Sequence, residues 1–308
     1  GLIINKFRGD KTILDPGVEM LEERSGIPVV GVAPYLNIQV EDEDSLTERF
    51  ETNRTVDLID IAVIRVPRIS NFTDFNPLES IQGVSLRYVK NPSELGNPDM
   101  IILPGTKNTM EDLLWMRENG LEALILKEAA KGKLIFGICG GYQMMGQEVL
   151  DPEHVEGDIE RLPGLGLLPI STRMSGEKVT RQVKFGLCNP HSPSSTLHSP
   201  FMQGYEIHMG VTTPVEGTPD SPLNLLENGS TDGYYVDSTC MGTYIHGILD
   251  NPEFIDFLLA PFGDKLSGNA GAFDYHTFKE EQYDRLAEHV RRHVNLPLIY
   301  QILTKNHD

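Results

Sequence analysis

Five short runs of almost uninterrupted apolar residues place the tightest constraint on the fold of this chain. The runs are Leu2–Asn5, Val29–Val32, Ile59–Val66, Met100–Leu103 and Leu134–Ile138. Apolar runs without alternation are typical of strands buried on both faces, as in a parallel sheet covered by helices. Between the last two runs, leucines recur at helical spacing over Thr109–Lys131, around Gly120. This strand–helix–strand order predicts an α/β fold with a parallel or mixed sheet flanked by helices.

A polar, acidic stretch at residues 41–57 has little to bury and indicates a domain boundary. We expect residues 1–52 to be the C-terminal end of one α/β domain with a linker, and residues 58–250 to form a second, complete domain. Residues 251–308 carry apolar residues at helical spacing, which predicts a helical segment that packs on the second domain. Because Gly1 already begins a strand-like run, we expect the chain to be a piece of a longer protein.

The charge and composition of the chain exclude some classes of partner. A net charge of -19 at pH 7 argues against binding to nucleic acid or to an anionic membrane, because both would be repelled. No apolar run approaches the roughly 20 residues that a membrane-spanning helix needs. Three cysteines make no disulfide framework and fit a cytoplasmic location.

The most informative stretch surrounds Cys139, where an apolar strand ends in Gly-Ile-Cys-Gly-Gly. Glycines at 137 and 141 allow a turn in which a Cβ atom would clash, and the turn leads directly into a helix-compatible segment. A sulfur held at a helix N-terminus is favoured as a thiolate, so Cys139 is predicted to be a catalytic nucleophile. The competing interpretation is a small buried core residue, which is the common fate of a free cysteine.

A cysteine nucleophile needs a partner that takes and returns a proton. His246 follows a strand-like run and is predicted to lie at the carboxyl edge of the sheet, where α/β proteins gather their sites. His208 is the main competitor, since it also lies in a strand-like run, with Glu206 two positions earlier on the same face. The residues themselves give His246 only a modest advantage.

A thioester pathway also needs two backbone N–H groups to stabilise an oxyanion. Gly140, directly after the nucleophile, is the natural first donor. Leu103-Pro-Gly-Thr-Lys-Asn-Thr109 turns the chain between a strand and a helix, which makes Gly105 the predicted second donor. An ordinary strand-to-helix turn is the alternative interpretation of this segment.

Taken together, these features resemble the class I glutamine amidotransferases and, among them, the cobyric acid synthase family of cobalamin biosynthesis. The segments that carry the resemblance are Asn5–Asp10, Gly31–Tyr35, Arg65–Leu78, Leu103–Thr109, Gly137–Gly146, Gly204–Gly210 and Gly242–Gly247. The resemblance implies that Cys139 is the nucleophile, His246 its base, and Gly105 and Gly140 the oxyanion donors. It also implies that ammonia from glutamine amidates peripheral carboxylates of a corrinoid, adenosyl-cobyrinic acid a,c-diamide.

The sequence departs from the family pattern in two places. Many class I amidotransferases orient the histidine with a Glu two residues later, but this position is Ile248, so the orienting group stays open between Glu206 and Asp250. No phosphate-binding Gly-x4-Gly-Lys-Ser/Thr motif occurs, so we expect no cofactor and no metal in this chain. ATP and Mg²⁺ are expected in an N-terminal synthetase domain of the same polypeptide.

Several other functions remain open at this stage. Within the same class, the alternatives are the related synthase that makes the a,c-diamide and the amidotransferase that acts on peptidoglycan precursors. A different cysteine hydrolase, such as a peptidase, would share the nucleophile but not the glutamine. A non-catalytic domain with a vestigial pocket would need neither.

Overall fold

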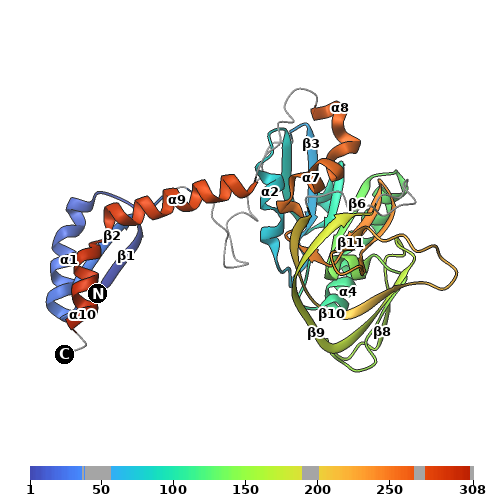
Figure 1. Ribbon diagram of the computed structural model, residues 1–308, viewed down its shortest axis with the longest axis horizontal. Coiled ribbons are helices and arrows are strands. Elements are labelled where there is room, and N and C mark those ends of the chain that lie inside the picture. Colours follow the sequence, from blue (N-terminus) through green and yellow to red (C-terminus); the bar gives the residue numbers. More distant parts are fainter. Residues whose placement is uncertain (37, 39–56, 189–200, 267–274, 306–308) are drawn as a thin grey trace. The chain divides into compact units, whose positions relative to one another are not determined.

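The computed structural model describes residues 1–36, 38, 57–188, 201–266 and 275–305. The chain forms two compact units, Gly1–Glu41 with His276–Asp308, and Asp42–Tyr275. In Figure 1 the first unit combines the blue and red ends of the sequence. The predicted domain end at residue 52 lies outside the described residues.

The first unit is built on two parallel strands, β1 (Leu2–Phe7) and β2 (Val29–Pro34), joined by helix α1 (Lys11–Ser25). Its other helices are α10 (Leu296–Lys305) and most of α9 (Tyr275–His293). Asn295 donates a backbone hydrogen bond to the Val30 carbonyl over 2.6 Å, which attaches the C-terminal helices to β2.

This attachment corrects the predicted division of the chain. Residues 251–308 were expected to pack as one segment on the second domain, but the part from His276 onward belongs with β1 and β2. Only α7 (Pro252–Leu259), the 3-10 turn η4 (Ala260–Phe262) and α8 (Gly263–Leu266) stay with the second unit. Helical periodicity identified the helices, but it carries no information on which apolar surface they cover.

The second unit contains a six-stranded sheet in the order β13-β14-β6-β5-β3-β4, in which all neighbours are parallel except β13 and β14. The strands are β3 (Ile59–Ile64), β4 (Val84–Val89), β5 (Met100–Leu103), β6 (Leu134–Ile138), β13 (Tyr234–Asp237) and β14 (Cys240–Thr243). Every residue of β3, β5 and β6 is buried, which confirms the predicted two-sided burial for these strands and the α/β class. The same prediction is wrong for β1, which has no buried residue, and only three of the six residues of β2 are buried, because each of these strands pairs only with the other in a two-stranded sheet.

A second, seven-stranded sheet adjoins the first. Its longest strands are β9 (Ile170–Leu187) and β10 (Met202–Pro214), which pair antiparallel. The shorter strands are β7 (Glu148–Leu150), β8 (Arg161–Pro163), β11 (Asn224–Leu226), β12 (Thr231–Asp232) and β15 (Ile245–His246). The chain passes from β14 in one sheet to β15 in the other at Tyr244, so His246 lies where the two sheets meet.

Besides α7, η4 and α8, the second unit has helices in the connections between its strands. They are η2 (Phe72–Phe75), α2 (Asn76–Glu79), α3 (Pro92–Leu95), α4 (Thr109–Asn119), α5 (Leu121–Ala130), α6 (Gly140–Met144) and η3 (Ile248–Asp250). The predicted helical stretch Thr109–Lys131 is two helices, because Gly120 adopts φ = 87° and ends α4. No helix in the described part of the chain is long and apolar enough to cross a membrane.

Candidate active site

Cys139 lies between the end of β6 and the start of α6, as the sequence predicts. Its backbone adopts φ = 51° and ψ = -112°, a conformation that is strained for a residue with a side chain and is typical of functional turns. A Cβ at position 141 would lie 2.0 Å from the Leu103 carbonyl oxygen, and one at 137 would lie 2.8 Å from the Tyr142 amide nitrogen. Both clashes confirm why this turn requires glycine on either side of the cysteine.

The Cys139 side chain opens into a cavity of about 340 Å³. The cavity is lined by Ser70, Asn71, Thr106, Lys107, Thr109, Gly140, Gln143, Glu156, Met174, Lys178, Ile207, His208 and Met209 together with Cys139. The thiol contacts the Ile207 carbonyl at 3.6 Å. Cys139 as a whole residue is only 8% exposed, but it lines a cavity that a small molecule can enter.

His246 is almost completely buried beside this cysteine. Its Nδ1 atom lies 2.7 Å from the Asp74 Oδ2 atom, and the other oxygen of Asp74 accepts a hydrogen bond from the Gly247 amide at 3.1 Å. The Tyr205 ring stacks on the imidazole with 5.3 Å between ring centroids. With Nδ1 facing Asp74, Nε2 is the ring nitrogen available to the Cys139 thiol.

The environment of His246 favours the protonated ring. Burial lowers its pKa, but the Asp74 carboxylate and hydrogen bonds to Asp74 and Cys139 outweigh this effect and raise the pKa to about 10. A histidine held between a carboxylate and a thiol can accept the thiol proton and keep it close to the sulfur.

Asp74 was not among the predicted site residues, and its position corrects the search for the orienting group. Glu206 is buried but pairs with Arg181, and strand alternation turns it to the opposite face of β10 from Tyr205. Asp250 is exposed at the end of η3, while the contact to His246 Nδ1 comes from Asp74. The one available signal was a carboxylate between two aromatic residues, Phe72 and Phe75, after the buried strand β3.

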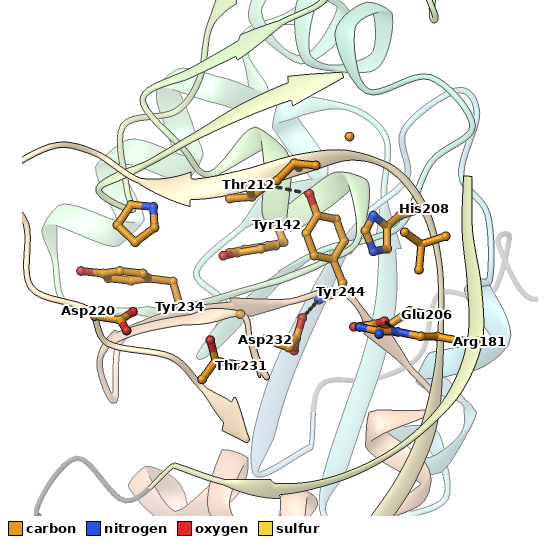
Figure 2. Close-up of a pocket in the computed structure, with 15 residues that line it drawn as sticks. Tyr142, Arg181, Glu206, His208, Thr212, Asp220, Thr231, Asp232, Tyr234 and Tyr244 are labelled. Carbon is orange, nitrogen blue, oxygen red and sulfur yellow. Dashed lines mark hydrogen bonds and ion pairs between the residues drawn. The ribbon is translucent and has the colours of Figure 1, made fainter. Parts of the chain in front are cut away.

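His208 lies on β10 and lines the Cys139 cavity, but its ring stacks on Tyr244, with centroids 3.7 Å apart. Figure 2 shows His208 together with Glu206 and Tyr244 at a second cavity, which has a volume of about 240 Å³. Burial lowers the pKa of His208, so the ring is neutral at pH 7. His208 therefore borders both cavities, whereas the contact to Asp74 distinguishes His246.

The two predicted oxyanion donors lie on adjacent turns. A Cβ at Gly105 would lie 3.2 Å from the His246 ring, and one at Gly140 would lie 3.2 Å from the Thr106 amide nitrogen. The Gly105 carbonyl accepts a hydrogen bond from the Ser70 amide at 2.9 Å, so the Thr106 N–H on the same peptide points away from Ser70. The turn after β5 is thus packed against both Gly140 and His246.

No group of three or more His, Cys, Asp or Glu residues in the described ranges is arranged to hold a metal ion. Cys188 and Cys240 are free, and burial raises the pKa of the Cys240 thiol to about 12. Neither lines the cavity that contains Cys139.

The parallel sheet, the glycine-flanked cysteine turn and the adjoining histidine are those of the class I glutamine amidotransferase fold. A solved structure of a glutamine amidotransferase matches 66% of this chain and 98% of its own, with a TM-score of 0.50 and 17% identity, which shows the fold. The model of the CobB/CobQ-like glutamine amidotransferase domain matches residues 60–254. The chain belongs to this family.

Curated relatives extend the similarity over nearly the whole chain. A cobyric acid synthase of Bacteroides fragilis is 56% identical over 99% of the chain, and one of Phocaeicola vulgatus is 52% identical over 99%. The chain spans 60% of the length of each of these relatives.

Proposed function

We propose that the second unit hydrolyses glutamine through a thioester on Cys139. His246 acts as general base and acid. Asp74 orients the His246 ring and stabilises its protonated form. The Gly140 amide and the turn at Gly105 stabilise the oxyanion. The contact of His246 Nδ1 with Asp74 at 2.7 Å is the observation that carries the proposal, because it fixes which ring nitrogen is available to the nucleophile.

The first half of the reaction forms the thioester. Because the raised pKa of His246 favours the protonated ring, the imidazolium holds the proton that Cys139 has given up, and the thiolate sulfur attacks the carbon of the glutamine side-chain amide. The resulting oxyanion is stabilised by backbone N–H groups of the two adjacent turns, including the Thr106 N–H as a further candidate. His246 then gives its proton to the amide nitrogen, the carbon–nitrogen bond breaks, and ammonia leaves.

The second half releases glutamate. His246 takes a proton from a water molecule, which attacks the thioester carbon and forms a second oxyanion at the same position. The carbon–sulfur bond breaks, the sulfur leaves as a thiolate beside the protonated His246 ring, and the starting state of the enzyme is restored. Asp74 stays ionised throughout and holds the ring in one tautomer.

We further propose that the ammonia serves ATP-dependent amidation of the peripheral carboxylates of a corrinoid, adenosyl-cobyrinic acid a,c-diamide. The names of the relatives and their identity to this chain support this role. ATP and Mg²⁺ would be bound by a synthetase portion of a longer protein, and the first unit would be part of that portion. The three free cysteines support a cytoplasmic location.

Ammonia release from glutamine tests the glutaminase proposal. The wild-type chain should release ammonia, and Cys139→Ser should release none above background, while Cys240→Ser should keep the wild-type rate. A panel of unstructured peptides should not be cleaved. Peptide cleavage without glutamine hydrolysis would identify a different cysteine hydrolase and overturn the proposal.

A further inference from the structure

One short segment, Arg68–Asp74, contacts both halves of the candidate active site. At one end, Asp74 contacts His246. At the other, the Arg68 carbonyl accepts a hydrogen bond from the Lys107 amide at 3.0 Å, and the Ser70 amide donates to Gly105. The segment therefore sets the position of the turn after β5 relative to the histidine.

Asp112 of helix α4 joins this segment to that turn. Its side chain is 0% exposed, and its Oδ2 atom accepts hydrogen bonds from the Arg68 amide at 3.1 Å and from the Thr106 hydroxyl at 2.5 Å. Its Oδ1 atom accepts a hydrogen bond from the Arg68 guanidinium at 3.1 Å. One buried carboxylate thus accepts hydrogen bonds both from Arg68, in the segment Arg68–Asp74, and from Thr106, in the turn after β5.

The chemistry of these contacts suits a rigid clamp. Hydrogen bonds to an ionised, buried carboxylate are stronger and more directional than neutral ones, and a missing acceptor would leave buried donors unpaired. The Arg68 guanidinium also forms an ion pair with Glu111, so two carboxylates of helix α4 bind this one side chain. The Thr106 hydroxyl also lies 3.2 Å from the Arg68 carbonyl and 3.4 Å from the Asn108 carbonyl. The Asp112 carboxylate, at 2.5 Å, is nearer than either, and the same oxygen accepts the hydrogen bond of the Arg68 amide.

We propose that Asp112 is a positioning residue for the reaction: it fixes the Gly105–Thr106 turn against Gly140 so that the backbone N–H groups are aimed at the oxyanion. The inference rests on the proposed glutaminase function. It assigns to Asp112 no contact with substrate, so its loss should affect the chemical step and leave the binding of glutamine largely intact.

The direct test is Asp112→Asn, which keeps the size of the side chain and one acceptor oxygen but removes the charge. The matched control is Asp60→Asn, because Asp60 is also buried and also pairs with an arginine, Arg87. Asp60 lies near the start of β3, whereas Arg68 and the candidate active site follow the end of this strand. Asp112→Asn should lower kcat for glutamine about tenfold or more while KM changes less than about twofold. Asp60→Asn should leave both constants unchanged once the rates are corrected for the folded fraction.

A second variant, Thr106→Val, tests the proposal if Asp112→Asn does not fold. A second readout, the amide NMR signals, tests it if the wild type does not hydrolyse glutamine. Thr106→Val removes the hydroxyl that donates to Asp112 and that accepts the hydrogen bond of the Asn108 amide, and it should also lower kcat. The amide NMR signals of Ser70, Gly105 and Gly140 should shift or broaden in Asp112→Asn and not in Asp60→Asn, whether or not the wild type hydrolyses glutamine. The assignment would be overturned by a wild-type kcat in both Asp112→Asn and Thr106→Val, or by unchanged NMR signals in Asp112→Asn. An inactive wild type combined with shifted signals in Asp112→Asn would overturn only the proposed function.

Discussion

The Asp74 carboxylate contacts the His246 imidazole at 2.7 Å although 172 positions separate the two residues in the sequence. Asp74 follows β3 and His246 follows β14, so both arrive from the ends of parallel strands in the same sheet. The same carboxylate also accepts the Gly247 amide, which fixes the backbone that carries the histidine. In the proposed mechanism this contact orients His246, a role for which the position of Ile248, two residues after the histidine, offers no carboxylate.

Replacing Asp74 by Asn should lower kcat for glutamine by roughly a hundredfold or more, because the imidazole loses both its tautomer control and the charge that stabilises its protonated form. Steady-state ammonia release measures the effect. The control is Asp250→Asn, which changes an exposed carboxylate near the same turn and should keep at least about half of the wild-type rate. A wild-type rate in Asp74→Asn would show that another group orients His246.

The raised pKa of His246 predicts how stability changes with pH. Its folded-state pKa, about 10, exceeds the ordinary value of 6.5, so the protonated ring stabilises the fold below pH 6.5 and this contribution is lost as the pH rises towards 10. In Asp74→Asn much of the raising influence is gone, so the contribution should be smaller. The measurement is the free energy of unfolding in urea at several pH values between 6.5 and 10.

The wild type should lose more of its free energy of unfolding over this interval than Asp74→Asn does. The variant shares all other titrating groups with the wild type, so the difference between the two curves reports the His246–Asp74 pair. Parallel curves would contradict the assigned pKa shift.

The glycine at 141 should tolerate no side chain. A Cβ there would lie 2.0 Å from the Leu103 carbonyl oxygen, which belongs to the neighbouring strand β5 and cannot move freely. Gly141→Ala should lower the free energy of unfolding by about 3 kcal/mol or more and abolish glutamine hydrolysis.

Gly176→Ala is the matched control for this substitution, because a Cβ at Gly176 would have no heavy atom of the described residues within 4 Å, apart from those of its chain neighbours. Denaturant unfolding of both variants measures the difference. Equal stability of the two variants would show that the nucleophile turn is looser than its backbone indicates.

Much of the fold could be predicted because burial on both faces leaves a plain trace in sequence. The strands β3, β5 and β6 are fully buried, and their residues are apolar or nearly so. The edge strand β4, with Ser85 and Arg87 among its residues, has no such trace and was not predicted. Of the long β9–β10 pair, only the run around His208 was predicted to be a strand, because both strands are partly exposed and rich in polar residues.

The candidate site divides in the same way. Cys139, Gly137 and Gly141 were predicted because the turn needs glycines at fixed spacing, which is a local constraint. His246 was preferred over His208 by its place at the end of a strand, and the structure adds the contact that separates them. Asp74 and Asp112 act through long-range contacts from a 3-10 turn and a helix. The aromatic residues on either side of Asp74 are a weak signal in sequence, and Asp112 has no comparable one.

Covalent labelling of Cys139 by a glutamine-mimicking diazo-ketone tests the central claim most directly, because it requires a reactive thiol, a glutamine-shaped cavity and access at once. Mass spectrometry of digested protein locates the modified residue. We predict a single modification at Cys139, slowed strongly in His246→Ala, prevented by excess glutamine, and absent from Cys188 and Cys240. An unmodified Cys139 in the wild type, or equal labelling of the other cysteines, would contradict the account.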